Sequence, residues 1–175
     1  MKKALLATLL ATVATMGVAQ AQSMDSFAGK TYIGIEGVTA KNDTVDGWRF
    51  GEKLFGGYNF NQNWAAEAGY TRFDSANRGS LETNGYNSYI AAKYAMPINE
   101  QFSGYAKLGV GRSVRKASDV GLSYRQADTS AYGALGVKYQ LDPNLALNLE
   151  YERNGKQKDV GAKADSLGLG LSYGF

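Results

Sequence analysis

The sequence predicts an all-β protein: an eight-stranded antiparallel transmembrane β-barrel, connected as an up-and-down meander and preceded by a cleaved signal peptide. Three observations lead to this fold class. An apolar leader opens the chain, apolar and polar residues alternate in eight later segments, and short turns alternate with longer polar connections. The composition agrees, because 22 glycines and 12 tyrosines with only two prolines are typical of many strands and tight turns.

The leader has the three parts of a secretory signal. Lys2 and Lys3 form a basic start, an apolar stretch runs from Ala4 to Val18, and Ala19-Gln20-Ala21 has the small-x-small pattern that signal peptidase cleaves. The stretch is too short for a spanning helix, and it lacks the polar stripe of an amphipathic helix that the mature protein would keep. We therefore expect a signal peptide at residues 1–21 and a barrel domain at residues 22–175.

Composition removes several classes of function. Without Lys2 and Lys3, 17 of the 19 basic residues remain against 16 acidic ones, so no nucleic-acid partner is expected. The chain has no cysteine and no histidine, which removes disulfides, the usual general base and the commonest metal ligand. We expect no catalytic residues, no metal and no cofactor.

Alternation with a period of two defines the strands. It is clearest at the C-terminus, where Leu167, Leu169, Leu171, Tyr173 and Phe175 share one face and the residues between them are glycine or serine. The expected strands are residues 33–36, 53–60, 64–70, 90–96, 102–110, 134–139, 145–152 and 166–175. Short turns are expected at 61–63, 97–101 and 141–144, and longer polar loops at roughly 41–48, 74–85, 115–125 and 154–163.

Periodicity alone does not say which face of a barrel points inward. A soluble barrel of the lipocalin type places its apolar face inside, whereas a membrane barrel turns it toward lipid. The serine and glycine face of the last strand suits a narrow lumen, and aromatic residues gather on the apolar face near the short turns, as in an interfacial girdle. The polar face carries about one charge per strand, and the charges balance: Glu36, Lys53, Glu67, Lys93, Lys107, Lys138, Glu150 and Glu152. We expect these side chains to form a lumen charge network in a membrane barrel.

Several stretches carry a family resemblance over essentially the whole mature sequence: residues 55–58, 68–70, 92–98, 136–139, 149–151 and 167–175. In order and spacing they resemble the transmembrane domain of OmpA and its small outer-membrane relatives. The resemblance implies location in the cell outer membrane, lumen charges at Lys93, Lys107 and Glu150, and a terminal aromatic signal at Tyr173 and Phe175 that the outer-membrane assembly machinery reads. OmpA itself continues into a periplasmic peptidoglycan-binding domain. This chain stops at Phe175, so anchoring to the cell wall is not expected.

Three classes of function remain open. The first is a structural or interaction barrel whose four surface loops meet lipopolysaccharide, host surfaces or phage. The second is a narrow pore for small solutes, although side chains can fill an eight-stranded barrel. The third is a lipid-modifying enzyme. The resemblance implies that such a site would use histidine, which this chain lacks, and pairing within the lumen is the simpler role for Glu150 and Glu152. We expect the first class, and no enzyme.

Basic residues gather in the third and fourth expected loops. Phosphate groups attract such residues, so we expect contacts with lipopolysaccharide at Arg112, Arg115, Lys116, Arg125, Lys156 and Lys158. The alternative is that these side chains are simply solvated.

Overall fold

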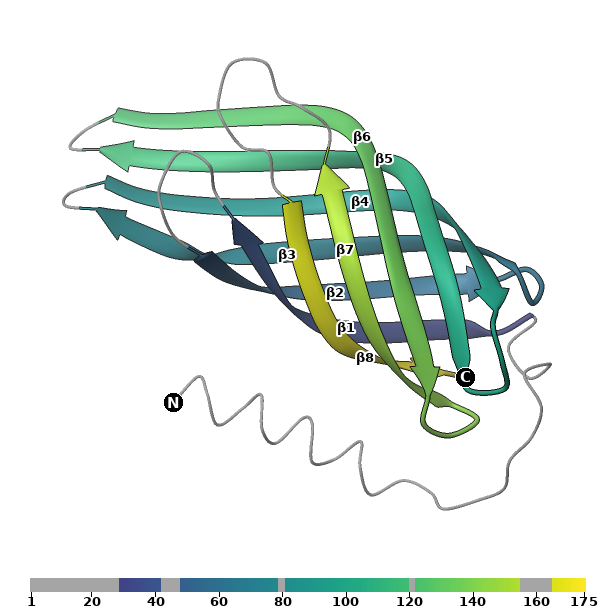
Figure 1. Ribbon diagram of the computed structural model, residues 1–175. Helices are drawn as coiled ribbons and strands as arrows, with labels where there is room; N and C mark the ends of the chain where they lie inside the picture. Colours follow the sequence, from purple (N-terminus) through teal and green to yellow (C-terminus); the bar gives the residue numbers. More distant parts are fainter. Residues whose placement is uncertain (1–28, 42–47, 79–80, 120–121, 155–164) are drawn as a thin grey trace.

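The structure, a computed structural model, describes residues 29–41, 48–78, 81–119, 122–154 and 165–175. The expected signal peptide lies outside the described residues. Eight antiparallel strands form a closed barrel in sequence order, with β1 paired to β8 (Figure 1). The strands are β1 (Thr31–Lys41), β2 (Trp48–Asn59), β3 (Trp64–Arg78), β4 (Leu81–Pro97), β5 (Phe102–Asp119), β6 (Leu122–Gln140), β7 (Leu145–Asn154) and β8 (Asp165–Gly174). No helix in these ranges is long and apolar enough to cross a membrane. The predicted fold class is confirmed.

Each short turn is closed in the same way. The side-chain Oδ1 of Asn61, Asn99 or Asp142 accepts hydrogen bonds from the backbone N–H groups two and three residues later, at 2.8–3.0 Å. Asparagine and aspartate are favoured in turns because their short side chains can replace a backbone acceptor. These turns follow β2, β4 and β6 and lie at the same end of the barrel as the C-terminus (Figure 1).

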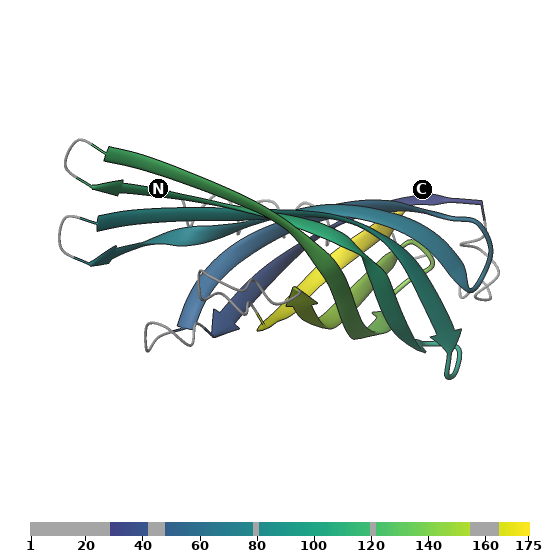
Figure 2. The ribbon, with the colours of Figure 1, turned by 90° about the horizontal axis from the view of Figure 1, so that it is seen from above.

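Two of the expected long loops are wrong. Residues 74–78 and 81–85 continue β3 and β4, and residues 115–119 and 122–125 continue β5 and β6. The two hairpins reach far beyond the ends of the other four strands (Figure 2). They pair with one another through β4 and β5 as far as Glu82 and Ser118. The sequence hides this extension because backbone pairing continues after the segment leaves the lipid, where neither face needs to be apolar.

The other two expected long loops coincide in sequence with two connections between consecutive strands. Residues 42–47 and 155–164 lie outside the described residues, between β1 and β2 and between β7 and β8.

The two faces of the sheet are inverted relative to a water-soluble protein. Large apolar residues such as Leu54, Ile90, Leu108 and Leu135 are exposed on the outside, whereas charged side chains are buried inside. A membrane barrel requires this arrangement, because its outer face meets hydrocarbon and its interior must satisfy its own polar groups.

Candidate functional site

The barrel interior holds one connected set of charged side chains. Period-two alternation turns a residue from each of six strands inward, with two from β7, and all of them are buried: Glu36, Lys53, Glu67, Lys93, Lys107, Glu150 and Glu152. Lys138 lies on the inner face of β6, opposite Ser103 and Asn148, and is half-buried. Sequence alternation placed all eight on one face, but only the register between strands decides which of them meet.

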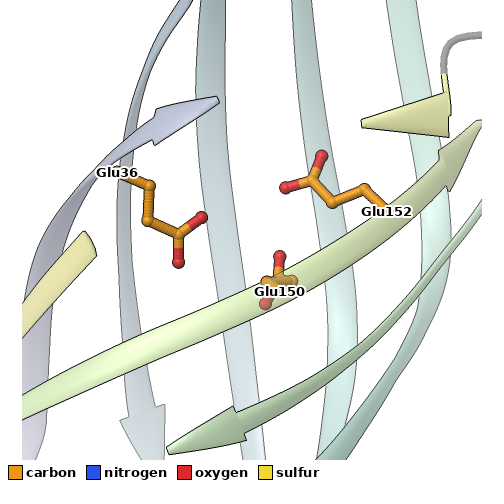
Figure 3. Close-up of side chains that lie close together, drawn as sticks. All are labelled: Glu36, Glu150 and Glu152. Carbon is orange, nitrogen blue, oxygen red and sulfur yellow. The ribbon is translucent and has the colours of Figure 1, made fainter. Parts of the chain in front are cut away.

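Lys53 is the centre of the first cluster. Its Nζ lies 3.1 Å from Glu36 Oε2 and 2.5 Å from Glu150 Oε1, and it also contacts Glu152 Oε1. The three carboxylates come from β1 and β7 and point toward one another inside the barrel (Figure 3). Three carboxylates this close could bind a metal ion, but here the lysine ammonium supplies the positive charge at their centre.

Glycines on β8 make room for this cluster. A side chain at Gly170 would collide with Glu36 and with the backbone of β1, and one at Gly168 would make tight contacts with Glu36 and Val38. The row of serine and glycine on the inner face of β8 therefore leaves the space that the longer side chains of β1, β2 and β7 occupy.

Lys107 joins this first cluster to a second one around Glu67. Its Nζ lies 2.5 Å from Glu150 Oε2 and 2.5 Å from Glu67 Oε1. Lys93 is opposite Lys107 in the register of β4 and β5 and lies 3.5 Å from Glu67 Oε2. The two lysines thus share one carboxylate, which offsets the repulsion expected between like charges on neighbouring strands.

Tyrosines complete the interior, and the predicted lumen network did not include them. Tyr32 donates a hydrogen bond to Glu67 Oε2 at 2.8 Å and Tyr89 donates one to Glu67 Oε1 at 2.5 Å. Tyr89 also stacks on Tyr132, with ring centroids 4.1 Å apart, and Lys93 Nζ lies 4.3 Å from the ring of Tyr105. The signal was available, because these tyrosines have the same alternation phase as the charged residues on their strands.

The charged side chains of the interior are buried and paired with one another. Lys53, Lys107, Glu67 and Glu150 have side chains that are almost completely inaccessible, and each carboxylate has an ammonium partner.

The outer face carries an aromatic girdle at the short-turn end. Trp64 packs edge-on against Tyr94 with ring centroids 4.9 Å apart, and Phe102 packs on Tyr139 at 4.7 Å. Tyr173 and Phe175, at the C-terminal end of the chain, form a T-shaped pair with ring centroids 5.3 Å apart. Amphipathic rings favour the boundary between hydrocarbon and headgroups, so the girdle marks one edge of the membrane-spanning band.

Arginines occupy the opposite edge of that band. Arg112 is exposed on the outer face of β5, two residues beyond Val110. Arg72 on β3 and Arg153 on β7 are also exposed and follow Tyr70 and Tyr151 in the same way. We call Arg72, Arg112 and Arg153 the arginine belt. Sequence analysis singled out only Arg112. The signal was available, because on β3, β5 and β7 an arginine stands two positions after an exposed apolar residue, namely Tyr70, Val110 or Tyr151.

The other basic residues that were predicted to contact lipopolysaccharide fall into two groups. Arg115, Lys116 and Arg125 lie in the extended hairpin of β5 and β6, where Lys116 and Arg125 are register partners. They do not lie in a loop, as the sequence suggested. Lys156 and Lys158 lie outside the described residues.

A closed barrel with an apolar, aromatic-edged exterior and an ion-paired interior defines a membrane-spanning β-barrel of the bacterial outer-membrane class. The chain belongs to the outer membrane protein beta-barrel domain family, whose profile matches residues 6–175. It is 29% identical to outer membrane protein A of Escherichia coli O157:H7 over 198 residues, covering all of this chain and 55% of that protein. Outer membrane protein A of Serratia marcescens is 33% identical over 144 residues, covering 73% of this chain and 40% of that protein. The chain thus spans about half the length of the curated relatives it matches.

Solved structures agree with this assignment. The attachment invasion locus protein Ail of Yersinia pestis superposes with a TM-score of 0.63 at 26% identity, covering 85% of this chain and 99% of that one. Neisserial surface protein A has the same fold, with a TM-score of 0.66 at 19% identity, covering 83% and 96%. The protein is therefore an outer-membrane β-barrel, and the expected location in the cell outer membrane is confirmed.

Proposed function

We propose that this protein is a structural and interaction barrel, which anchors in the outer membrane and presents a rigid surface beyond it. The observation that carries the proposal is the unequal height of the barrel. Strands β3 to β6 have 15 to 19 residues, whereas β1, β2, β7 and β8 have 10 to 12. A transmembrane strand needs about 9–11 residues, so the four longer strands continue well past the bilayer.

The extension is a sheet with an accessible edge. β7 pairs with β6 only over Tyr132–Gln140, so in the described part of the chain residues 122–131 of β6 are paired on one side, by β5. Unpaired backbone groups at such an edge, together with side chains on both faces, offer a contact surface for large partners such as host or phage proteins. The surface is held in place by the barrel rather than by a flexible loop.

Lipopolysaccharide is the partner that the arginine belt favours. Arginine binds phosphate through paired hydrogen bonds, and the belt lies at the outer edge of the apolar band, where lipid A phosphates are found. Arg153 also lies 3.8 Å from Asp165, an exposed pair that a phosphate could replace at little cost. Ail has been crystallised with sucrose octasulfate, a heparin analogue, which is consistent with anionic saccharide binding in this class of barrel.

Binding of purified lipopolysaccharide to the folded barrel tests this proposal. Replacing Arg72, Arg112 and Arg153 together with glutamine should weaken binding, and the difference from the unchanged protein should shrink at high salt. The matched lysine variant keeps the charges and loses the paired hydrogen bonds, so it should fall between the two. Unchanged binding of the glutamine variant at low ionic strength would mean that the belt is merely solvated.

The packed lumen counts against the alternative of a narrow pore. The side chains of Lys53, Lys107 and Glu150 fill the interior where an ion would have to pass. Single-channel recording in planar bilayers should therefore find no steady conductance. Steady conductance that disappears in a Glu150→Gln variant would favour the pore instead.

The N-terminal leader suggests how the protein is exported. We infer cleavage after Ala21 during export, because Ala19-Gln20-Ala21 follows the apolar stretch. Mass spectrometry of the membrane-embedded protein should find Gln22 at its N-terminus, and a mature form that still carries Lys2 and Lys3 would contradict this.

We also propose that Tyr173 and Phe175 are read by the assembly machinery. Replacing Phe175 with serine should slow assembly in cells while leaving refolding in detergent intact.

A further inference from the structure

The ion-paired network of the lumen contains more carboxylates than ammonium groups. In the described part of the chain, six ion pairs join four carboxylates to three ammonium groups: Glu36, Glu67, Glu150 and Glu152 with Lys53, Lys93 and Lys107. The fourth lysine of the inner face, Lys138, is opposite Asn148 and therefore nearer the short turns than Glu150. The balance of four acids and four bases holds for the whole inner face, but it does not hold locally.

The excess of negative charge lies where β1 and β7 bring three carboxylates together. Glu150 contacts both Lys53 and Lys107. Among the ion pairs of the described residues, Glu36 and Glu152 have one each, and both are with Lys53. Two carboxylates thus share one ammonium group at this end of the network.

All three carboxylates of this cluster are almost inaccessible to water. Glu36, Glu150 and Glu152 are between 1% and 3% exposed, and one oxygen of each lies within 4.8 Å of the other two. Glu36 points into the cluster (Figure 3), and its Oε1 is buried without a hydrogen-bond partner among the described residues. A buried acceptor without a donor costs free energy, and so does a buried charge without a partner.

The groups around the cluster favour a proton as the missing cation. The β8 residues beside Glu36 are glycines. The other inward groups that face the cluster are two phenols, an ion-paired carboxylate and its lysine: Tyr89 on β4, Tyr132 on β6, Glu67 on β3 and Lys107 on β5. A metal ion would have to lie beside the Lys53 ammonium group, which repels it, whereas a proton bonds to a carboxylate oxygen and needs no space of its own.

We propose that Glu36, Glu150 and Glu152 together hold one proton at neutral pH, and that Glu36 or Glu152 carries it. A buried carboxylate without a cation of its own is neutralised by protonation, and two carboxylates in one site can share a proton because like charges at short range oppose each other. The protonated carboxyl also donates a hydrogen bond, which supplies the donor that the cluster lacks.

The proton makes the stability of the barrel depend on pH. Glutamate in an unfolded chain ionises at about pH 4.3, so at neutral pH the folded state holds one proton more than the unfolded state. Stability should therefore fall as the pH rises, and the equilibrium constant for unfolding should increase about tenfold per pH unit between roughly pH 5.5 and 7.5. The chain has no histidine, which is the side chain that would ordinarily titrate in this interval.

Urea titration of the barrel in lipid vesicles across this interval tests the proposal. Glu36→Gln and Glu152→Gln each remove one negative charge from the cluster, so each variant should need no proton and should lose the pH dependence. The matched control is Glu52→Gln, a change at an exposed residue next to Lys53 on β2, and this variant should keep the dependence.

Infrared spectroscopy detects the proton directly. The unchanged protein, folded at neutral pH in a detergent without ester groups, should show the carbonyl stretching band of a protonated carboxyl, and isotopic labelling of glutamate should shift that band. The band should be missing in both cluster variants and present in the control. The measurement on the unchanged protein decides the question even if a cluster variant does not fold.

Three results would overturn the proposal. Absence of the band from the unchanged protein would mean that all three carboxylates are ionised. A band that persists in both cluster variants would place the proton on another residue. Stability that does not change with pH but increases with added sodium or calcium would assign the missing charge to a metal ion.

Discussion

On strand β5, Lys107 and Leu108 are neighbours in the chain and lie in opposite surroundings. Lys107 is 1% exposed among carboxylates, and Leu108 is 74% exposed on the lipid-facing surface. Side chains on the inner face are stabilised by contacts with specific partners, whereas side chains on the outer face are stabilised by the surrounding hydrocarbon. Substitutions on the two faces should therefore fail for different reasons: an inner one leaves a partner unpaired, and an outer one brings charge into lipid.

Removing Lys53 should have the largest effect on the inner face. Lys53→Met leaves Glu36, Glu150 and Glu152 together without their shared ammonium group. Breaking one side of a buried ion pair costs about 3–5 kcal/mol, so the free energy of unfolding should fall by that amount. Urea titration in lipid vesicles, followed by tryptophan fluorescence, measures it.

Lys93→Met is the matched control for that variant. Lys93 contacts Glu67 at 3.5 Å, and Glu67 keeps Lys107 at 2.5 Å when Lys93 is removed. The loss of stability should therefore be clearly smaller than for Lys53→Met. Equal losses would mean that lumen charges act by number rather than by the particular contacts described above.

A lysine on the outer face should be the next most costly change. Ala92 is exposed, faces away from the lumen and lies five residues from the end of β4 near the girdle. Ala92→Lys should lower the free energy of unfolding by roughly 2–4 kcal/mol, the cost of lysine near the bilayer centre. The same substitution at Gln101, which is exposed in the turn between β4 and β5, should cost close to nothing. A small effect at Ala92 would contradict lipid contact there.

A single hydrogen bond to the network should have the smallest effect. Tyr89→Phe removes the 2.5 Å bond to Glu67 Oε1 and keeps the ring that stacks on Tyr132. Glu67 still accepts from Tyr32 and Lys107, so the expected loss is about 1–2 kcal/mol. A loss as large as that of Lys53→Met would show that the tyrosine hydroxyl, rather than the ammonium groups, holds Glu67 in place.

The sequence predicted most of what the membrane imposes. Alternation placed Lys93 and Lys107 on one face and Ala92 and Leu108 on the other, because hydrocarbon on one side and a narrow lumen on the other leave few choices. Which charged side chains contact each other in the lumen was not predictable in this way. That Lys53 meets Glu150 depends on how β1, β2, β7 and β8 are staggered around the barrel, and a single strand does not encode that stagger.

The tall hairpins were missed for a different reason. Beyond Arg72 and Arg112 the regular alternation of apolar and polar residues stops, although the backbone still pairs. Polarity was therefore interpreted as a loop. The interior tyrosines have the same alternation phase as the charged residues, but the predicted lumen network included charged side chains only.

Lipid exposure at neighbouring residues tests the assignment of the two faces most directly. The chain has no cysteine, so single cysteines can carry a spin label at Ala91 and Ala92, Ala134 and Leu135, or Asn148 and Leu149. Collision with a lipid-soluble relaxing agent should be frequent at 92, 135 and 149 and rare at 91, 134 and 148. The reverse pattern, or contact with water at all six positions, would contradict a membrane barrel with its charges inside.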